Sequence, residues 1–302
     1  MKNKRKKSSK KYHRNSFKSI FGIALFAILP LIYGIYLCIP EIQITLFQTI
    51  KESKEKAVPN CLRYENLEIP ISQHSLNGQL VCHKGYTVSY NKTQKIPNWV
   101  AYELTRQETK GNAQRNNQFL ADPSIKGNMA TNSDYSHSGF DKGHMAPAAD
   151  MKWSNEAMKE SFYFSNICPQ HPELNRRKWK DLEDKVREWA VADSSIFIVC
   201  GPIMNKESHT IGKNQVAVPT RFFKVILSLY GSPPKAIGFV FNNEPATKPL
   251  RNYAVSVDSV EQLTGLDFFS PLPDSLENKL ESQTNIALNG NKSVYQKLKM
   301  KK

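Results

Sequence analysis

The sequence predicts an α+β domain built around a central, largely antiparallel sheet and preceded by one N-terminal transmembrane helix. Five short runs rich in Ile, Val and Phe have the composition of strands, and one longer run has apolar residues at helical spacing. An uncharged stretch lies near the N-terminus. Of the 302 residues, those after about the first 60 are enough for one domain with a full core.

The N-terminal segment predicts a membrane anchor. Residues 1–18 carry nine Lys and Arg and no acid, and residues 19–40 contain no charged residue over 22 positions. Roughly 20 apolar residues cross the hydrocarbon core as a helix. Because cationic segments stay inside, we expect a cytoplasmic basic tail, a single-pass anchor and the remaining chain outside the cytoplasm, typical of a bacterial envelope protein.

A cleavable signal peptide is the alternative interpretation of this segment. Its apolar core would be about 7–15 residues long and would be followed by small residues. Tyr36, Leu37 and Ile39 are large, which favours an uncleaved cell-membrane anchor.

The remaining chain divides into three parts by composition. Residues 41–60 mix charged and apolar positions and predict a stalk, residues 61–282 form the domain, and residues 283–302 form a polar, basic tail. Four cysteines, which allow three pairings, follow the predicted anchor: Cys61, Cys82, Cys168 and Cys200. We expect a Cys61–Cys82 bridge, because it would tie the start of the domain to its first strand, and we expect the other two to be buried.

The secondary structure follows from these patterns. A helix over 175–191 is predicted by apolar residues three and four positions apart, namely Trp179, Leu182, Val186 and Trp189. Strands are predicted at residues 85–90, 99–104, 195–200, 221–229 and 236–241.

The run FDKGHMAPAADM at residues 140–151 contains a candidate catalytic histidine, His144. Gly143 before it would let the backbone turn sharply and present the imidazole at a strand end. An imidazole with an ordinary pKa near 6.5 accepts a proton from water near neutral pH. A lone exposed histidine is more often a surface residue, so this run is weak evidence by itself.

A second block places three polar side chains on the predicted helix: Asn175, Glu183 and Arg187. At about 100° per residue, Glu183 and Arg187 lie roughly 80° and 120° around the helix from Asn175. One half of the helix would then offer an oxygen ligand for a hard cation such as Mg²⁺, an acid for its bound water and a cation for phosphate. The alternative is a helix cap at Asn175 with solvated charges after it.

Together, the two blocks resemble the DNA/RNA non-specific endonuclease family. The matching motifs are Asp141-Lys142-Gly143-His144, the run SNICPQ at residues 165–170 and the run LNRRKWKDLE at residues 174–183. The resemblance extends upstream to GYTVSYN at residues 85–91 and to Asp122-Pro123. It extends downstream to Cys200-Gly201-Pro202 and to LTGLDFF at residues 263–269, so it covers almost all of residues 80–270.

The resemblance implies a ββα-metal (His-Me finger) endonuclease fold and a role for each motif residue. His144 would activate the attacking water, and Asn166 would orient the site. Asn175 would be the sole direct protein ligand of Mg²⁺, with Mn²⁺ or another divalent cation possible, and Glu183 would hold a metal-bound water. Arg187 and Arg115 would steady the scissile phosphate.

Lys142 departs from the family motif, which has Arg at this position. Arg presents a planar fork and Lys a compact charge, so the positive charge for a phosphate contact is kept but the bidentate geometry is lost. The resemblance also makes a homodimer possible.

The sequence therefore predicts a membrane-anchored, Mg²⁺-dependent, sequence-non-specific endonuclease acting on DNA, RNA or both. The formal net charge of +15, from 42 Lys and Arg against 27 Asp and Glu, suits a polyanion. One alternative is a catalytically silent envelope protein that binds nucleic acid. Another is an anchored phosphodiesterase or phosphatase for small substrates.

Overall fold

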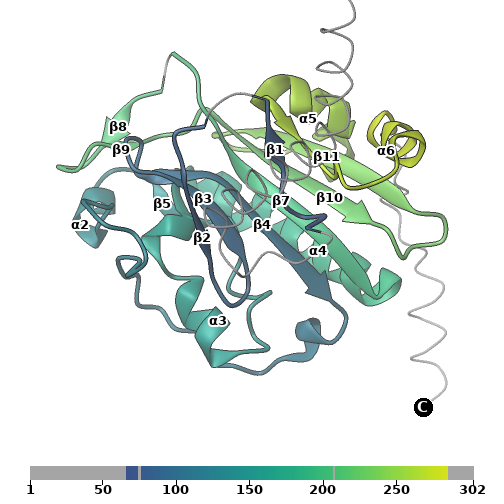
Figure 1. Cartoon of the computed structure of the whole chain (residues 1–302). Helices are drawn as coiled ribbons and strands as arrows, with labels where there is room; N and C mark the ends of the chain where they lie inside the picture. The colour runs from purple at the N-terminus through teal and green to yellow at the C-terminus, as the bar shows by residue number, and fades with distance from the viewer. Residues whose placement is uncertain (1–65, 74–75, 207, 285–302) are drawn as a thin grey trace, which may run out of the picture. The chain divides into compact units, whose positions relative to one another are not determined.

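The computed structural model describes residues 66–73, 76–206 and 208–284 (Figure 1). The chain divides into two units, Met1–Val58 and Pro59–Lys302, and every described residue belongs to the second. The predicted cytoplasmic tail, membrane span and stalk, and most of the C-terminal tail, lie outside the described residues. Within the described part, no helix is long and apolar enough to cross a membrane.

A seven-stranded antiparallel sheet forms the centre of the domain (Figure 1). The five strands predicted from composition are present as β3, β4, β7, β10 and β11, with ends shifted by a few residues. The α+β class and the central antiparallel sheet are therefore confirmed. In spatial order the strands are β12 (Ala254–Val255), β11 (Lys235–Asn242), β10 (Arg221–Ser228), β7 (Ser195–Ile203), β4 (Ile96–Thr105), β3 (Thr87–Asn91) and β2 (Gln79–Cys82).

The two faces of this sheet are covered by separate layers. On β10, Phe222 and Ile226 pack into one core, whereas Phe223, Val225 and Leu227 pack into the other. Successive side chains of a strand point to opposite faces, so this alternation buries both sides of the strand. The sheet therefore separates two structural layers, and each layer packs against a different set of strand side chains.

The first layer holds the hairpin of β5 (Asp141–His144) and β6 (Ile167–Gln170), together with helix α4 (Lys180–Asp193). The predicted apolar stripe of that helix is buried in the first core. Short elements around it are η1 (Glu108–Lys110), α2 (Asn132–Tyr135), α3 (Asn155–Glu160), η2 (Phe164–Asn166), β8 (Thr210–Ile211), β9 (Val216–Ala217) and η4 (Leu250–Asn252).

The second layer holds two C-terminal helices, α5 (Val257–Thr264) and α6 (Asp274–Glu281). Val257, Val260 and Leu280 from these helices belong to the second core. A small ladder of β1 (Ile71–Ser72) with β13 (Leu266–Asp267) lies beside them.

The helix predicted from Asn175 has two parts, and the prediction of one continuous α-helix was wrong. Residues Leu174–Trp179 form a π-helix, η3, that runs directly into α4. Because a π-helix closes its hydrogen bonds five residues apart, it turns less per residue than 100°. The helical positions calculated for Glu183 and Arg187 relative to Asn175 therefore do not hold. The residue at the N-cap is Glu173, so the capping role for Asn175 is also wrong.

Glycine is required at position 143 because a side chain there would clash with Gln170, and not because the backbone turns there. It lies inside β5, opposite Cys168 of β6, and His144 is the last residue of the strand. A Cβ at Gly143 would overlap the Gln170 side chain. The predicted placement of the imidazole at a strand end is confirmed, but the predicted sharp turn is absent from this strand.

The described cysteines are of two kinds, free and disulfide-bonded. Cys168 and Cys200 are free and buried, as expected for residues in apolar strands. Cys82 is disulfide-bonded, and its partner lies outside the described residues, where the expected partner Cys61 also lies.

Candidate active site

The segment Asp141–Asp150, which starts with β5, contacts the predicted site residues along its length. Its first four residues pair with β6, with Asp141 opposite Gln170 and His144 opposite Ile167. The chain then leaves the ladder and runs through Met145 and Ala146 to Asp150. Asn166, Asn175 and Arg187 form hydrogen bonds with this segment, whereas Arg115 and Glu183 interact with it only through their charges.

His144 lies against two aromatic rings. Its ring centroid is 4.8 Å from that of Phe162, in an edge-on arrangement, and 5.4 Å from that of Phe119. The Nε2 atom is buried and has no hydrogen-bond partner among the described residues. Burial, assisted by the positive charge of Arg115, lowers the pKa of His144 to about 3. Desolvation therefore favours the neutral form of this imidazole relative to a histidine in water.

Two cations lie over the same aromatic rings. The Cζ atom of Arg115 is 5.0 Å from the centroid of Phe162, and the Nζ atom of Lys142 is 4.5 Å from that of Phe119. Lys142 also donates a 2.8 Å hydrogen bond to Oδ1 of Asn132. Neither cation forms an ion pair with a described carboxylate, so both charges are available to an anion beside His144.

Asn166 holds the backbone immediately after His144. This fully buried side chain accepts a hydrogen bond from the Ala146 N–H through Oδ1 and donates one to the Ala146 carbonyl through Nδ2, each 2.8 Å long. Its Nδ2 also donates to the Ser161 carbonyl at 2.8 Å. The Met145 N–H donates to the Asn166 carbonyl at 3.0 Å. These are the contacts that the predicted orienting role requires.

Asn175 is held by the first residue of β5. Its Nδ2 donates a 2.9 Å hydrogen bond to Oδ2 of Asp141, and Arg176 donates to both oxygens of the same carboxylate at 2.8 and 2.7 Å. The Oδ1 atom of Asn175 forms no hydrogen bond with any described residue. A free, oriented amide oxygen suits a hard cation that keeps most of its water ligands, so the residues present fit Mg²⁺.

Arg187 is engaged with carboxylates of the protein. Its Nη1 donates a 2.6 Å hydrogen bond to Oδ1 of Asp150, a buried side chain, and its Nη2 pairs with Asp184. Tyr102 donates to the other oxygen of Asp150 at 2.8 Å. Although burial opposes charge, these carboxylates raise the pKa of Arg187. The guanidinium therefore compensates a buried carboxylate, and its predicted contact with phosphate stays a prediction.

Glu183 lies near this pair on α4. Burial raises the pKa of its carboxyl to about 7, an effect that the charge of nearby Lys224 opposes and that of Asp150 reinforces. Glu183 makes no hydrogen bond with a described residue. No direct hydrogen bond among the described residues joins His144 to Asn175 or Glu183. The segment Asp141–Asp150 links His144 to Asn175 through Asp141, and the charge of Asp150 acts on Glu183.

Lys224 is a residue of this region that the sequence interpretation missed. It lies in the middle of β10 and is only 1% exposed. Its Nζ donates to the Met145 carbonyl at 3.4 Å and is 4.7 Å from the ring centroid of Trp179. A lysine in the centre of the apolar run FFKVILSL was the available signal, because a buried charge needs compensating partners. Asp141 belongs to the matching motif Asp141-Lys142-Gly143-His144, but neither its partners nor those of Asp150 could be inferred from the sequence.

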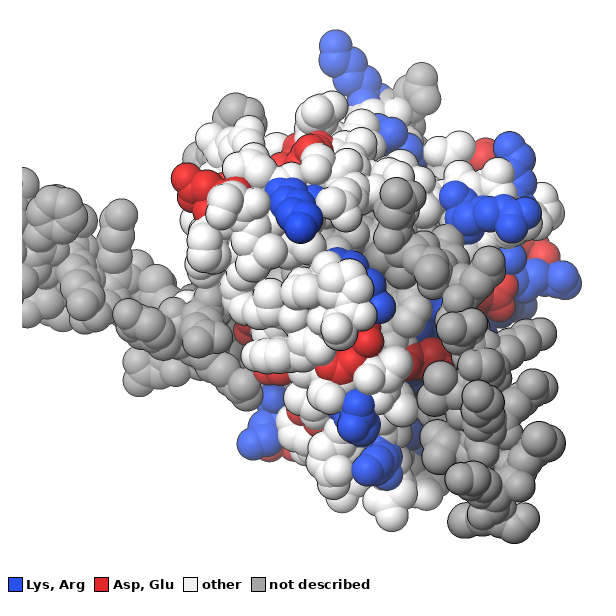
Figure 2. Space-filling view, turned by 90° about the vertical axis from the view of Figure 1, so that its right-hand side faces the viewer, with Lys and Arg blue, Asp and Glu red and all other residues white. Residues whose placement is uncertain are grey.

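The basic surplus of the chain lies mainly outside the domain. Residues 66–284 contain 24 Lys and Arg against 23 Asp and Glu. On the face drawn in Figure 2, basic and acidic side chains are interspersed. A cavity of about 430 Å³ elsewhere, beside Phe140, His209 and Asn243, includes none of the predicted site residues. The described domain therefore offers an anion the local charges of Arg115 and Lys142 rather than a large overall positive charge.

Comparison with known proteins decides the family. A model of the DNA/RNA non-specific endonuclease family matches residues 65–275. The chain belongs to this family. The predicted family is confirmed, and the predicted enzyme class, a nuclease, is the class of that family.

Individual members of the family match over similar lengths. Mitochondrial nuclease EXOG of Danio rerio is 39% identical over 63% of this chain and 60% of its own length. Human mitochondrial endonuclease G is 34% identical over 66% and 72%, and a nuclease of Nostoc sp. is 34% identical over 68% and 78%. The chain spans only 60% and 57% of the Danio rerio and Xenopus laevis EXOG nucleases.

A solved structure supports the fold. The crystal structure of an EndoG/EndoGI complex, described as showing the mechanism of EndoG inhibition, matches with a TM-score of 0.61 and 30% identity. The match covers 68% of this chain and 91% of that one. The antiparallel sheet and its layers are therefore shared with a structurally known member of the endonuclease family.

The Asn166 contacts predict a large effect on stability. Asn166→Ala removes partners from the Ala146 N–H and from two buried carbonyls, and each unsatisfied buried group costs about 1–3 kcal/mol. We expect a loss of about 3 kcal/mol in the free energy of unfolding, measured by urea denaturation. Asn278→Ala, at an exposed site on α6, is the matched control and should change stability by less than about 0.5 kcal/mol. Equal effects of the two substitutions would contradict a stabilising role for the buried hydrogen bonds of Asn166.

His144 and His83, both partly buried, predict opposite pH dependences of stability. The pKa of His144 is lowered to about 3, so the unfolded chain binds the extra proton first, and the stability that the neutral ring contributes is lost as the pH falls from about 6.5 towards 3. For His83, burial opposes the charge, but the 2.8 Å hydrogen bond to Asp122 and the ion pair with Glu160 raise the pKa to about 9. Its contribution is complete below about 6.5 and is lost as the pH rises towards 9.

The measurement is urea unfolding of the wild type, His144→Gln and His83→Gln at a series of pH values. Relative to His144→Gln, the wild type should lose stability on acidification. Relative to His83→Gln, it should lose stability on alkalinisation. A wild-type advantage over His144→Gln that grows on acidification would refute the neutral, desolvated imidazole.

Proposed function

We propose that this chain is a divalent-metal-dependent, sequence-non-specific endonuclease that hydrolyses phosphodiester bonds of DNA, RNA or both. The chain belongs to this endonuclease family, and one observation in its structure carries the proposal. The segment Asp141–Asp150 presents a neutral imidazole beside two unpaired cations and fixes an amide whose oxygen is free. This combination places a base, an anion site and a cation ligand around one short stretch of chain, with Arg115 and Asn175 contributed from outside it.

In the proposed reaction, His144 accepts a proton from the attacking water. Burial keeps the ring neutral before the reaction, which is the state that accepts a proton. Arg115 and Lys142 bind the phosphate and stabilise the negative charge that gathers on its oxygens in the transition state. A bound phosphate beside His144 would also favour the imidazolium, which makes the buried ring a stronger base when substrate is present.

Asn175 would hold the metal directly through Oδ1, and Glu183 would hold it through a water molecule. Mg²⁺ is the cation we propose, with Mn²⁺ as the alternative, because an amide oxygen and a carboxylate are hard ligands. When bound, the cation supplies charge stabilisation to the phosphate oxygens. Asp141 orients the amide, and Arg176 holds Asp141 in place.

Arg187 would act by holding Asp150, a neighbouring residue of the site. Its ion pair with Asp150 neutralises a carboxylate close to Glu183, so the substitution Arg187→Ala would leave a buried charge unpaired. We therefore assign Arg187 a positioning role besides the contact with phosphate that the family resemblance implies.

Digestion assays test the proposed activity. Plasmid DNA and RNA are incubated with the wild type, His144→Ala and Asn175→Ala in the presence and absence of Mg²⁺. We expect His144→Ala to lose at least about 100-fold in rate, because general-base catalysis contributes about 10²–10⁴-fold, while binding of DNA persists. Asn175→Ala should lose activity and change its dependence on metal concentration or identity. His137→Ala, an exposed histidine outside the site, is the control and should keep the wild-type rate.

The same assay separates the alternatives. A wild type that binds nucleic acid but leaves it intact would indicate the catalytically silent binding protein. Cleavage of a small phosphodiester with intact polymers would indicate the small-substrate enzyme. Abundant cleavage by His144→Ala would refute the assignment of the base.

We also propose that residues 19–40 anchor the nuclease domain outside the cytoplasm, with residues 1–18 inside. The proposal rests on the uncharged run and the nine basic residues that precede it. Expressed in bacteria, the full chain should sediment with membranes and resist extraction at high salt, and a chain that begins at Cys61 should be released. External protease should digest the domain in spheroplasts. A full chain recovered in the soluble cytoplasmic fraction would contradict the anchor.

Light scattering of the chain that begins at Cys61 would test whether the domain forms the homodimer that the family resemblance suggests.

A further inference from the structure

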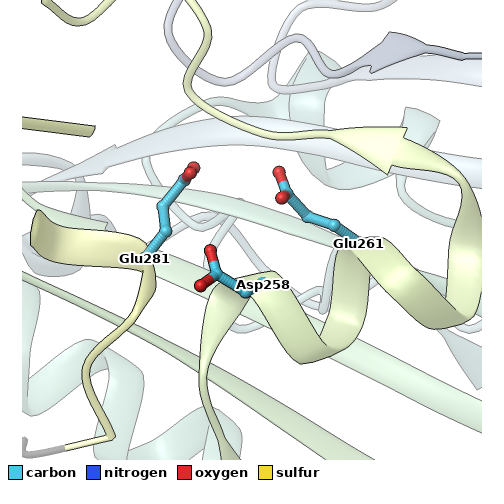
Figure 3. Close-up of side chains that lie close together, drawn as sticks. All are labelled: Asp258, Glu261 and Glu281. Atoms are coloured by element: carbon cyan, nitrogen blue, oxygen red, sulfur yellow. The ribbon is translucent and has the colours of Figure 1, made fainter. Parts of the chain in front are cut away.

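Three carboxylates converge between helices α5 and α6 (Figure 3). Asp258 and Glu261 lie three residues apart on α5, and Glu281 is the last residue of α6. One oxygen atom from each of the three lies within 4.8 Å of the others. Both helices pack on the second core, so this cluster lies on the opposite face of the sheet from the candidate active site.

Glu281 is buried without a partner. Only 5% of the residue is exposed, and its Oε1 has no hydrogen-bond partner in the described part of the chain. Figure 3 shows its carboxylate directed towards those of Asp258 and Glu261. Burial and the charges of neighbouring carboxylates, Glu261 foremost, raise the pKa of Glu281 to about 9. A carboxylate in this position requires either a bound proton or a cation.

The described residues around the cluster supply no compensating charge. None of the three carboxylates forms an ion pair with a described Lys or Arg. Two further acids, Asp267 on β13 and Glu277 on α6, add to the negative potential at Glu281. Glu261 does accept one hydrogen bond, from the Phe268 N–H at 2.9 Å, which fixes its carboxylate between the helix and the following strand.

The spacing of the oxygens fits one metal ion. Ca²⁺ binds oxygen ligands at about 2.3–2.6 Å, so two oxygens on a common ion are at most about 5 Å apart. The separations here meet that condition for all three carboxylates at once. Mg²⁺ usually keeps several waters and binds one or two carboxylates, whereas Ca²⁺ tolerates a larger and less regular set of oxygens.

We propose that Asp258, Glu261 and Glu281 form a second divalent-cation site, selective for Ca²⁺ over Mg²⁺, with a structural role. The ion would join the end of α6 to the first turns of α5. Leu280, next to Glu281, is buried in the second core, so fixing this end of α6 also holds its apolar contact. The site is separate from the catalytic metal predicted at Asn175 and serves stability rather than phosphodiester cleavage.

Thermal unfolding with and without Ca²⁺ tests the site. The protein that begins at Cys61 is dialysed against EDTA and then measured in Ca²⁺, Mg²⁺ or EDTA, as the Asn175→Ala variant so that the predicted catalytic metal does not contribute. We expect millimolar Ca²⁺ to raise Tm by roughly 5 °C or more, and Mg²⁺ to raise it less. Glu281→Gln should abolish the Ca²⁺ effect. Glu277→Gln, which removes one charge from the same helix outside the ligand set, should retain it.

Calorimetric titration with Ca²⁺ provides a readout independent of unfolding. One ion should bind to the Asn175→Ala protein, and binding should be lost in Glu281→Gln. If Glu281→Gln does not fold, Asp258→Asn, at a partly exposed position, replaces it in both measurements. No Ca²⁺-dependent change in Tm and no binding heat, or an equal response in the variant, would overturn the proposal and leave a protonated Glu281 as the explanation of the cluster.

Discussion

The amide of Asn166 is the contact on which the candidate active site depends. The β5–β6 ladder ends at the pair His144 and Ile167, and beyond this point the chain has no strand partner. Asn166 supplies one, because its side chain bonds both the N–H and the carbonyl of Ala146. A buried amide can satisfy both groups at once, and leaving them unpaired would be costly. The direction in which the chain leaves His144 is therefore fixed by one side chain.

Contacts with charged and polar side chains hold the rest of the segment. Asp141 at its start binds Asn175 and Arg176, the Met145 carbonyl accepts from Lys224, and Asp150 at its end pairs with Arg187. Burying the charges of Lys224 and Asp150 costs free energy, which their partners offset only while each is present. The arrangement gives the site its geometry and makes its residues interdependent, since removal of either member of a pair leaves the other without compensation.

The central sheet keeps catalysis and C-terminal packing apart. Alternating side chains of β10 enter one core beneath the site and another beneath α5 and α6. The acidic cluster on the second face can therefore respond to a cation without touching His144 or Asn175. Lys224 belongs to the first face and brings a positive charge to the carboxylates there, while no described cation does the same for Glu281.

The sequence by itself determined the α+β class, the five main strands, the buried stripe of α4, the family and the motif residues, because periodicity and motif spacing are local properties of the chain. It could not reveal the π-helix around Asn175, since the same apolar spacing fits a continuous α-helix. The low pKa of His144, the reason for Gly143 and the partners of Arg187 were decided by the tertiary structure. Each depends on residues distant in sequence, namely Phe162, Gln170 and Asp150, and desolvation or steric contact exists only once the chain has folded.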